Sequence, residues 1–346
     1  MSDMLTTISP LDKRAQKQLD ALLEQEGIRR DGNLDYSCGI FDGNMRLAAT
    51  GSCFANTIRC LAVDSSRQGE GLLNQIVSHL MEVQAARGNG HVFLYTKPGT
   101  ARFFGDLGFY EIARAEGSLV FMENRRSGFA GYCKRLAEQK MGGDSASIVM
   151  NANPFTLGHL HLVERAAAEN KTVHLFILSE EAGPIPFAVR RKLVREGVSH
   201  LGNVICHDSG PYIISSATFP SYFLKDGDTV IRAQAALDIQ VFQAIAESLD
   251  IRRRYAGEEP TSRVTGLYNE IMAQRLPELG IECRIIPRLE KDGRAVSASE
   301  VRQAIHDGEV ERALDLLPES SRRYFTSPEA EPVIKFIRNT KNVVHY

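Results

Sequence analysis

Two segments that lie far apart in the sequence carry residue types suited to binding phosphate. In the first, residues 148–163, an apolar strand ends, an Asn153-Pro154 step turns the chain, and a helix is expected to begin near Thr156. The N–H groups at a helix start are unpaired and the helix dipole is positive there, so such a start attracts anions. Gly158 lets a phosphate approach the backbone closely, and His159 lies in the first turn of the same helix. The segment therefore predicts a site for a triphosphate.

The second segment, residues 296–302, is expected to begin another helix. It contains Ser297, Ser299 and Arg302. Serine hydroxyls, the N–H groups of a helix start and a guanidinium fork can all donate hydrogen bonds to one phosphate group. Helix capping would explain either serine alone, but the two segments together favour a site for a nucleoside triphosphate.

Alternating strands and helices are expected to position both segments. From about residue 145 onward, short apolar runs alternate with amphipathic stretches, which is typical of a parallel sheet covered by helices. The expected strands are residues 147–150, 173–178, 204–206, 229–232, 253–256 and 282–286, and the expected helices are residues 157–169 and 187–198.

Other polar residues are expected beside the carboxyl ends of these strands, where open α/β sheets bind ligands. Gly257 and Glu258 follow a strand and are expected to contact the adenine or the ribose. Arg190 lies in a helix and can reach phosphate, although a solvated helix arginine explains it equally well. Asp238 either contacts substrate or is a carboxylate at a helix start.

Metal ligation by protein side chains is not expected. His159 and His161 stand two residues apart on a helix, so they point in different directions, and no third ligand stands nearby. The six cysteines include no CxxC pair, which argues against a zinc site and a disulfide framework. We expect buried or incidental thiols.

Composition excludes several classes of partner. The 346 residues have a formal net charge of -2, so we expect a folded chain that binds no nucleic acid. No apolar run approaches the roughly 18 residues of a membrane span, and the N-terminal stretch lacks the apolar core of a signal peptide. We therefore expect a cytoplasmic protein without a membrane partner.

The first part of the chain contains a glycine loop between an expected strand, residues 58–63, and an expected helix. This loop contains Gln68, Gly69 and Gly71. It resembles the Q/R-x-x-G-x-G/A loop of the GNAT acetyltransferases, although its last position departs from that pattern, and the resemblance implies that its backbone N–H groups hold the pyrophosphate of CoA. Residues 103–109 resemble the Phe-Tyr-x-x-x-Gly-Phe stretch of the same family. The resemblance implies a GNAT-like α+β fold.

The two phosphate-binding segments resemble the motifs of the nucleotidyltransferase superfamily. The first resembles the HxGH signature, with Thr156 at the first histidine position and His159 at the second. The second resembles the C-terminal ISSTxxR motif. The resemblance implies a Rossmann-like parallel-sheet domain that directs attack on the α-phosphate of a nucleoside triphosphate.

Length and a polar linker predict two domains. The chain is longer than one ordinary domain, and residues 138–145 are polar, contain a glycine pair and have no periodicity. We expect an α/β protein with a GNAT-like α+β domain at residues 1–140 and a nucleotidyltransferase domain at residues 141–346.

This domain pair resembles the [citrate (pro-3S)-lyase] ligase family over nearly the whole chain, and residues 257–260 and 264–269 add to the resemblance. It implies that ATP and acetate form acetyl adenylate. The acetyl group then passes to the thiol of the CoA-derived prosthetic group on the acyl carrier subunit of citrate lyase, and AMP and diphosphate are released. Mg²⁺ is expected with ATP.

The resemblance also implies roles for individual residues. Thr156, His159 and Arg302 are the expected catalytic residues, with His159 at the α- and β-phosphates and Arg302 at the departing diphosphate. Gln68, Gly69 and Gly71 form the candidate loop for the carrier arm or CoA. The expected ATP contacts are Asn153, Pro154, Phe155, Gly158, Arg190, Gly257, Glu258, Ser297 and Ser299.

Two alternatives stay open. An adenylyltransferase that acts on a phosphorylated pantetheine-like acceptor would use the same phosphate-binding residues. A CoA-sensing or carrier-binding protein with vestigial sites is the other alternative, and the presence of both phosphate motifs argues against it.

Overall fold

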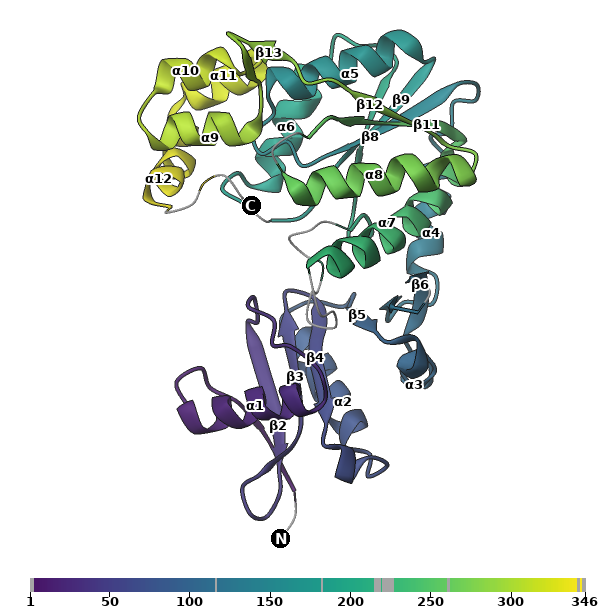
Figure 1. Cartoon of the computed structure of the whole chain (residues 1–346), viewed down its shortest axis with the longest axis vertical. Coiled ribbons are helices and arrows are strands. Elements are labelled where there is room, and N and C mark those ends of the chain that lie inside the picture. The colour runs from purple at the N-terminus through teal and green to yellow at the C-terminus, as the bar shows by residue number, and fades with distance from the viewer. Residues whose placement is uncertain are drawn as a thin grey trace. The chain divides into compact units, whose positions relative to one another are not determined.

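The computed structural model describes residues 3–115, 117–181, 183–214, 219, 227–259, 262–340 and 343. The chain forms two compact units: the first comprises residues 1–131 and 219–240, and the second comprises residues 132–218 and 241–346 (Figure 1). The predicted ranges 1–140 and 141–346 differ from these units at two places. Helix α4 (Gly128–Ala137) is divided between the units, and residues 219–240 belong to the first unit. Tyr132 of α4 packs against Tyr212 with ring centroids 5.0 Å apart, which joins the end of this helix to the second unit.

The first unit is built on a mixed seven-stranded sheet. Its strands are β1 (Met4–Thr7), β2 (Tyr36–Phe41), β3 (Leu47–Phe54), β4 (Thr57–Val63), β5 (Phe93–Thr96), β6 (Tyr110–Ala115) and β7 (Leu119–Glu123), and its helices are α1 (Lys13–Gln25), α2 (Leu72–Ala86) and α3 (Ala101–Asp106). The strand order is β1-β2-β3-β4-β5-β7-β6. Only β4 and β5 are parallel neighbours, and they pair at just two positions, Thr57 with Phe93 and Ile58 with Leu94. The two strands therefore separate beyond these pairs, and the glycine loop follows β4.

Helices α1 and α2 contribute to two separate apolar clusters of this unit. Leu19 and Leu22 of α1 pack with Phe41 in one cluster, and Ile76 and Leu80 of α2 pack in the other. The buried residues of α1, Ala15, Leu19, Leu22 and Leu23, stand at helical spacing and form its apolar face.

The second unit is built on a parallel five-stranded sheet. Its strands are β8 (Ser145–Met150), β9 (Thr172–Ile177), β10 (Val204–Asp208), β11 (Ile251–Gly257) and β12 (Glu282–Ile286), with a small hairpin of β13 (Glu290–Lys291) and β14 (Arg294–Ala295). Its helices are α5 (Leu157–Glu169), α6 (Phe187–Gly197), α7 (Gly227–Leu249, whose first part belongs to the first unit), α8 (Arg263–Glu278), α9 (Ala298–His306), α10 (Val310–Asp315), α11 (Glu319–Phe325) and α12 (Glu331–Asn339).

The order of these strands creates a place for a ligand. The order is β10-β9-β8-β11-β12, and every neighbouring pair is parallel. The chain order reverses between β8 and β11, and open α/β sheets bind ligands beside the carboxyl ends of the strands at such a switch point. The predicted fold class, an α/β chain with an α+β first domain followed by a Rossmann-like parallel-sheet domain, is confirmed by the two sheets.

The main core of the second unit joins the two segments that the sequence assigns to phosphate. Val163 of α5 and Val194 of α6 are fully buried in one apolar cluster with Val301 and Ile305 of α9. Burial of this kind fixes the positions of the two helix starts, because packed side chains leave little room for one helix to shift against another. The strand predicted at residues 282–286 and the helix predicted at residues 157–169 have these bounds in the structure.

The prediction of a strand at residues 229–232 is wrong, because these residues lie in α7. The β-branched run Thr229-Val230-Ile231 favours a strand locally. However, Ile231, Ala235, Phe242 and Leu249 are buried at helical spacing, so burial decides the conformation.

Asp238 also differs from its prediction. It lies in the middle of α7, not at a helix start, and its side chain is 1% exposed. It belongs to the first unit and is not among the described residues that line the cavity of the second unit.

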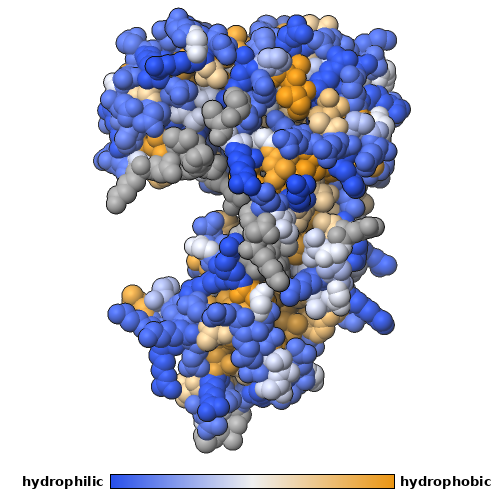
Figure 2. All heavy atoms as spheres, in the orientation of Figure 1, coloured by the Kyte–Doolittle hydropathy of each residue, from blue (hydrophilic) through white to orange (hydrophobic). Residues whose placement is uncertain are grey.

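Among the described residues, we find no helix that combines the length and the apolar character of a membrane span. Figure 2 shows hydrophilic residues over much of the viewed face, with smaller apolar areas between them.

Candidate active site

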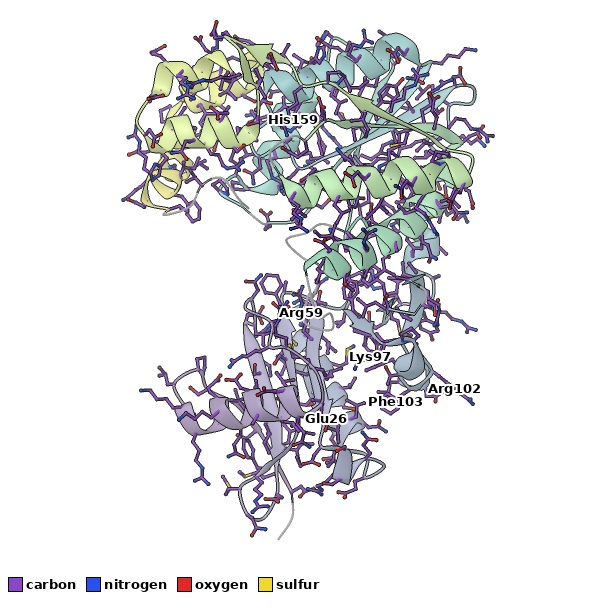
Figure 3. The ribbon with its side chains drawn as sticks, viewed as in Figure 1. Glu26, Arg59, Lys97, Arg102, Phe103 and His159 are labelled. Atoms are coloured by element: carbon purple, nitrogen blue, oxygen red, sulfur yellow. The ribbon has the colours of Figure 1, made fainter. Side chains whose placement is uncertain are left out.

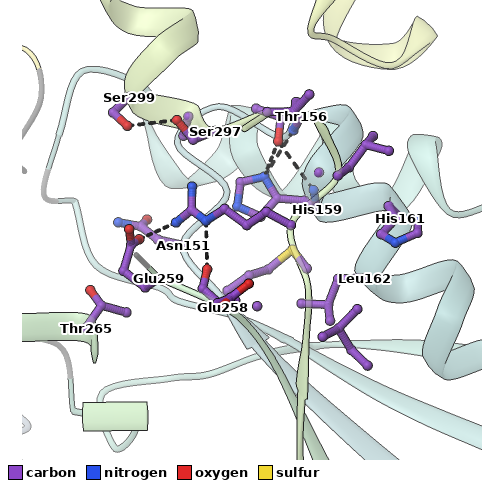
Figure 4. A pocket seen from close by; sticks show the side chains of 18 of the residues that line it. Asn151, Thr156, His159, His161, Leu162, Glu258, Glu259, Thr265, Ser297 and Ser299 are labelled. Carbon is purple, nitrogen blue, oxygen red and sulfur yellow. Dashed lines mark hydrogen bonds and ion pairs between the residues drawn. The ribbon is translucent and has the colours of Figure 1, made fainter. Parts of the chain in front are cut away.

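The second unit contains a cavity of about 680 Å³ beside the carboxyl ends of β8 and β11. The start of α5, the loops after β11 and β12, the start of α8 and the start of α9 line it (Figure 4). Both segments that the sequence assigned to phosphate therefore face one cavity at the switch point of the sheet.

The start of α5 is held by a reciprocal pair of hydrogen bonds. The hydroxyl of Thr156 accepts a hydrogen bond from the backbone N–H of His159 at 3.3 Å, and the N–H of Thr156 donates to Nδ1 of His159 at 3.1 Å. This is a capping box in which a histidine takes the place of the usual acidic or amide residue. Because Nδ1 accepts, the proton of the neutral ring is on Nε2.

Burial keeps the ring of His159 neutral. Burial, together with the smaller effects of the nearby charges of Arg288 and Arg302, lowers the pKa of this histidine to about 4. The ring lies on the α5 side of the second unit (Figure 3) and lines the cavity. At neutral pH His159 therefore offers a hydrogen-bond donor without a positive charge.

Gly158 has a steric role that the sequence did not reveal. A Cβ at this position would lie 2.5 Å from the carbonyl oxygen of Val296, just before α9. Glycine thus lets the start of α5 and the segment before α9 pack closely together. The prediction attributed this glycine to the approach of a phosphate, and it does line the cavity, but its closest neighbour is the protein backbone.

The start of α9 brings two hydroxyls to the cavity. Ser297 caps the helix by accepting a hydrogen bond from the N–H of Glu300 at 3.1 Å, and its Oγ lies 2.9 Å from Oγ of Ser299. Both serines line the cavity (Figure 4). One of the two hydroxyls donates to the other, so the pair keeps one hydroxyl proton that a phosphate oxygen can accept.

Arg302 lines the cavity but is tied to the backbone. Its Nε donates to the carbonyl of Val343 and its Nη1 donates to the carbonyl of Asn153, both at 2.6 Å. The residue is only 6% exposed. Part of its guanidinium therefore fixes the turn before α5, and a contact with phosphate stays a prediction.

Arg190 does not have either of its predicted environments. It is fully buried, and its guanidinium donates to the carbonyls of Asn151, Leu178, Ile185 and Glu180. It is not among the described residues that line the cavity. We therefore reassign it from a phosphate contact to a residue that holds the loops after β8 and β9.

Asn153, Pro154 and Phe155 are likewise not among the described residues that line the cavity. All three are buried, and Asn153-Pro154 is a cis peptide bond. Phe155 belongs to the apolar core, and its ring stacks on His159 with centroids 6.0 Å apart. These residues support the start of α5 from behind, so the structure gives no support for direct ATP contacts by them.

Gly257 and Glu258 line the cavity as the sequence predicted. The N–H of Glu258 donates to the carbonyl of Ile286 at 2.9 Å, and Nδ2 of Asn269 donates to the carbonyl of Gly257 at 3.0 Å. The loop after β11 is thus fixed by its neighbours. Pro260, which belongs to the same motif, lies outside the described residues.

Sequence reasoning gave no role to several polar residues of the cavity, among them Asn151, Glu259 and Arg288. Asn151 follows β8 directly, Glu259 follows β11 after one residue, and Arg288 follows β12 after one proline. Their place beside the carboxyl ends of parallel strands was the available signal. Oδ1 of Asn151 is buried and has no hydrogen-bond donor among the described residues, so it can accept from a ligand.

The comparisons with known proteins agree with this geometry. A sequence model of the citrate lyase ligase C-terminal domain matches residues 145–325. The [citrate [pro-3S]-lyase] ligase of Klebsiella pneumoniae is 36% identical over 313 residues, which cover 89% of this chain and 91% of that protein. The one of Escherichia coli K12 is 31% identical over 330 residues, which cover 93% and 94%. The chain belongs to the [citrate [pro-3S]-lyase] ligase family. The predicted family and the predicted enzyme class are confirmed.

Solved acyltransferase structures match about a third of this family member. One, a putative acyl-CoA N-acyltransferase from Klebsiella pneumoniae, covers 35% of this chain and 95% of its own, with 16% identity and a TM-score of 0.29. Another, from Pseudomonas aeruginosa, covers 36% and 100%, with 16% identity and a TM-score of 0.32. The α+β assignment of the first unit rests on the sheet described above.

The glycine loop of the first unit is open to solvent. Gln68, Gly69 and Gly71 are exposed, and the two glycines have φ values of 88° and 75°. Gly71 directly precedes α2, and among the described residues no side chain caps that helix start. The loop has the backbone expected for binding an anion, and its role stays a prediction.

The described residues contain no group of three or more His, Cys, Asp or Glu side chains that could hold a metal ion. His161 lines the same cavity as His159 but comes from another side of the helix.

All six cysteines are free, and burial raises the pKa of Cys38 and Cys60 to about 12, so these two thiols stay protonated.

Proposed function

We propose that this protein uses ATP to activate acetate as acetyl adenylate and then acetylates the thiol of the prosthetic group on the acyl carrier subunit of citrate lyase. The observation that carries this proposal is that the starts of α5 and α9 line one cavity, at the switch point of a parallel sheet. Membership in the ligase family supports the choice of reaction.

In the first step, an oxygen of acetate attacks the α-phosphorus of ATP. A phosphorus–oxygen bond forms, the bond from the α-phosphorus to the bridging oxygen breaks, and diphosphate leaves with the electron pair. The protein supplies no nucleophile. Its contribution is to hold the reactants in line and to place hydrogen-bond donors where charge develops.

His159 is the donor that we assign to the phosphates at the reacting end. Its Nδ1 is occupied by Thr156, so Nε2–H is the group left to face a ligand. A neutral donor of this kind stabilises a phosphate oxygen without a change of protonation state. Ser297 and Ser299 are assigned to the phosphates that leave, with Arg302 behind them, and Gly257 and Glu258 to the nucleoside.

Mg²⁺ is expected to accompany ATP. This ion keeps several water ligands and usually takes one or two protein carboxylates together with the phosphates. Few protein ligands are expected for it, and the described residues contain no group of three or more His, Cys, Asp or Glu side chains that could hold the ion. When bound, the ion neutralises phosphate charge, while the residues of the chain orient the reactants.

In the second step, the thiol sulfur attacks the acetyl carbon of the adenylate. A thioester bond forms, the carbon–oxygen bond to AMP breaks, and the thiol proton passes to solvent. The loop at Gln68, Gly69 and Gly71 is our candidate for holding the diphosphate of the CoA-derived arm during this step.

The test is to incubate the protein with ATP, Mg²⁺, acetate and deacetylated citrate lyase, and to measure AMP, diphosphate and recovered lyase activity. Acetate-dependent exchange of diphosphate into ATP reports the first step alone. We expect His159→Ala to lower this exchange about a hundredfold or more, because it removes one preorganised donor. Circular dichroism and melting temperature serve as folding controls.

Two outcomes would contradict the proposal. An adenylyl group retained on a phosphorylated pantetheine-like acceptor, with no AMP released, would identify an adenylyltransferase instead. Exchange that is unchanged in His159→Ala would remove this histidine from the site.

A further inference from the structure

Arg288 is a second guanidinium of the cavity, and neither phosphate-binding segment contains it. It follows β12, its Nε donates to the carbonyl of Glu258 at 2.7 Å, and its Nη2 pairs with the carboxylate of Glu259 (dashed lines at Glu258 and Glu259 in Figure 4). Among the described residues, none accepts a hydrogen bond from Nη1 of Arg288. One edge of the guanidinium is therefore held, while Nη1 keeps two N–H groups for a ligand.

Glu258 and Glu259, which hold one edge of the Arg288 guanidinium, lie in the loop after β11, and this loop is itself tied to the start of α8. Oε1 of Glu259 accepts a hydrogen bond from the N–H of Ser262 at 3.2 Å, next to the start of α8, while the other oxygen pairs with Arg288. The side chains of Arg288 and Glu259 are 21% and 14% exposed. An arginine held in this way loses little conformational entropy when an anion binds.

Arg288 and Arg302 use their guanidinium groups differently. Arg302 is the arginine of the sequence motif, but it directs Nε and Nη1 to backbone carbonyls and is nearly buried. Arg288 directs only one N–H to a carbonyl, and its partner carboxylate leaves Nη1 uncovered. Of the two, Arg288 is better arranged to meet a charged oxygen with a pair of donors.

Arg288 also acts on His159 through its charge. Burial is the main reason why the pKa of His159 is lowered, and Arg288 is the next contributor, ahead of Arg302. The other charged groups of the cavity are Glu258 and Glu259, from the loop after β11. A ligand oxygen bonded to His159 would therefore lie within the field of Arg288 as well.

We propose that Arg288 is an anion-binding residue of this active site, that Nη1 contacts a charged oxygen of the substrate, and that Glu259 is the positioning residue that aims it. Two substrates of the proposed function carry such oxygens, because ATP has phosphates and acetate has a carboxylate. The inference rests on the proposed function for the identity of these anions. The inference assigns to Arg288 an anion contact, whereas the two phosphate-binding segments assign such contacts to His159 and Arg302 and to the two serines.

The test compares Arg288→Ala and Arg288→Lys with a matched control, Arg284→Ala. Arg284 lies on β12 and forms ion pairs with Glu169 and Glu282, and it is not among the described residues that line the cavity. Calorimetry gives the affinities for Mg·ATP and for diphosphate, and exchange kinetics give KM for acetate. We expect Arg288→Ala to weaken at least one of these by about tenfold or more, the value of a charged hydrogen bond. Arg288→Lys should recover only part of the loss, because an ammonium cannot donate as a fork.

The pattern of losses identifies the anion. Weaker binding of Mg·ATP and diphosphate with an unchanged KM for acetate assigns Arg288 to phosphate, and the reverse assigns it to the carboxylate. The acid limb of the exchange reaction should also move to higher pH in Arg288→Ala, since loss of the neighbouring charge raises the pKa of His159. That shift reports the charge of Arg288 beside His159, whereas the affinities and the KM report its contact with an anion.

The proposal is overturned if Arg288→Ala binds Mg·ATP and diphosphate and uses acetate as the wild-type protein does. Failure of the proposed function gives a different result. A wild-type protein that binds Mg·ATP but shows no acetate-dependent exchange would refute acetate activation, and the nucleotide affinities of the Arg288 variants would then decide the role of Arg288 by themselves.

Discussion

The two helix starts that the sequence assigns to phosphate groups are built in different ways. At the start of α5 in the second unit, Thr156 caps the helix, and Nδ1 of His159 accepts a hydrogen bond from the backbone N–H of Thr156. The backbone at Gly158 packs against the carbonyl of Val296. The start of α2 in the first unit follows Gly71, which has a φ of 75°, and among the described residues no side chain caps it. We call the start of α5 the closed start, because side chains cap it and another segment packs against it, and we call the uncapped, exposed start of α2 the open start.

The difference shows that a glycine beside a helix start can serve two purposes. Gly158 is needed because another part of the chain lies where a side chain would begin, whereas no described atom lies within 4 Å of a Cβ built on Gly71. The start of α5 faces the cavity together with other protein groups. The start of α2 supplies backbone N–H groups and a left-handed glycine, which is backbone suited to an anion.

The largest expected effect is that of Gly158→Ala, which breaks the closed start. The new Cβ would meet a backbone oxygen at 2.5 Å, so α5 and the segment before α9 must move apart. We expect acetate-dependent ATP–diphosphate exchange to fall by about a hundredfold or more, because displacements of this size disrupt an in-line arrangement. Gly202→Ala, where no described atom lies within 4 Å of the new Cβ, is the control for a glycine replacement in the same unit. Exchange at the wild-type rate in Gly158→Ala would show that the two starts do not act together.

The sequence patterns predicted the position of the closed start correctly, but they did not predict the surroundings of the side chains near it. The Thr156–His159 segment and the bounds of α5 and β12 follow from local signals, namely a cap, a periodic apolar face and a short apolar run. The assignments of Arg190 and of residues 229–232 failed because burial decides them. A buried arginine that binds four carbonyls and an exposed one have the same local sequence signal, and a β-branched run becomes helical when its apolar positions pack at helical spacing.

The predicted domain boundary shows the same dependence on long-range contacts. The polar stretch near residue 140 predicts a linker, but the two units divide within α4, and residues 219–240 from the second half of the chain belong to the first unit. No local signal in the sequence reports that these residues belong there. Arg288 was missed for a related reason, because it pairs with Glu259 from the loop after β11 and its charge acts on His159 of α5.

A smaller effect is expected when only the cap of α5 is removed. Thr156→Ala deletes the hydroxyl that accepts from the N–H of His159 and that lies 2.9 Å from its Nδ1. Loss of an N-cap side chain costs about 1 kcal/mol, and the imidazole loses one of its two supports, so we expect exchange to fall about tenfold. Thr156→Ser keeps the hydroxyl and should stay near the wild-type rate. Equal losses in both variants would point to the methyl group of threonine instead of the cap.

Acid should act on the second unit through three histidines: His174 and His207, which are buried, and His159, which is partly exposed at the wall of the cavity. Burial lowers the pKa values of His159 and His174 to about 4 and that of His207 to about 3, from an ordinary value of 6.5. The unfolded chain therefore binds more protons than the folded chain between about pH 6.5 and pH 4, and the free energy of unfolding should fall as the pH falls through this window. Urea denaturation followed by circular dichroism at pH 7.5, 6 and 5 measures this.

His159→Asn is the matched variant for this slope, because it removes one of the three titrating rings from the closed start. Its free energy of unfolding should depend less steeply on pH than that of the wild-type protein. A slope that is unchanged, or a stability that rises on acidification, would mean that these rings are not neutral in the folded protein.

The smallest expected effect on ATP chemistry is that of the open start. Gly71→Ala forces an alanine into the left-handed region, which costs about 1 to 2 kcal/mol locally, but the added Cβ meets no described atom within 4 Å. Because the loop lies in the other unit from the cavity, we expect ATP–diphosphate exchange to remain at the wild-type level in Gly71→Ala and in Gln68→Ala. If the loop holds the CoA-derived arm, both variants should instead raise KM for deacetylated citrate lyase by several fold. Reactivation of the lyase with an unchanged KM would show that this helix start is open because nothing binds there. A parallel loss of exchange would show that the first unit contributes to the adenylation site, and the contrast between the two starts would then no longer hold.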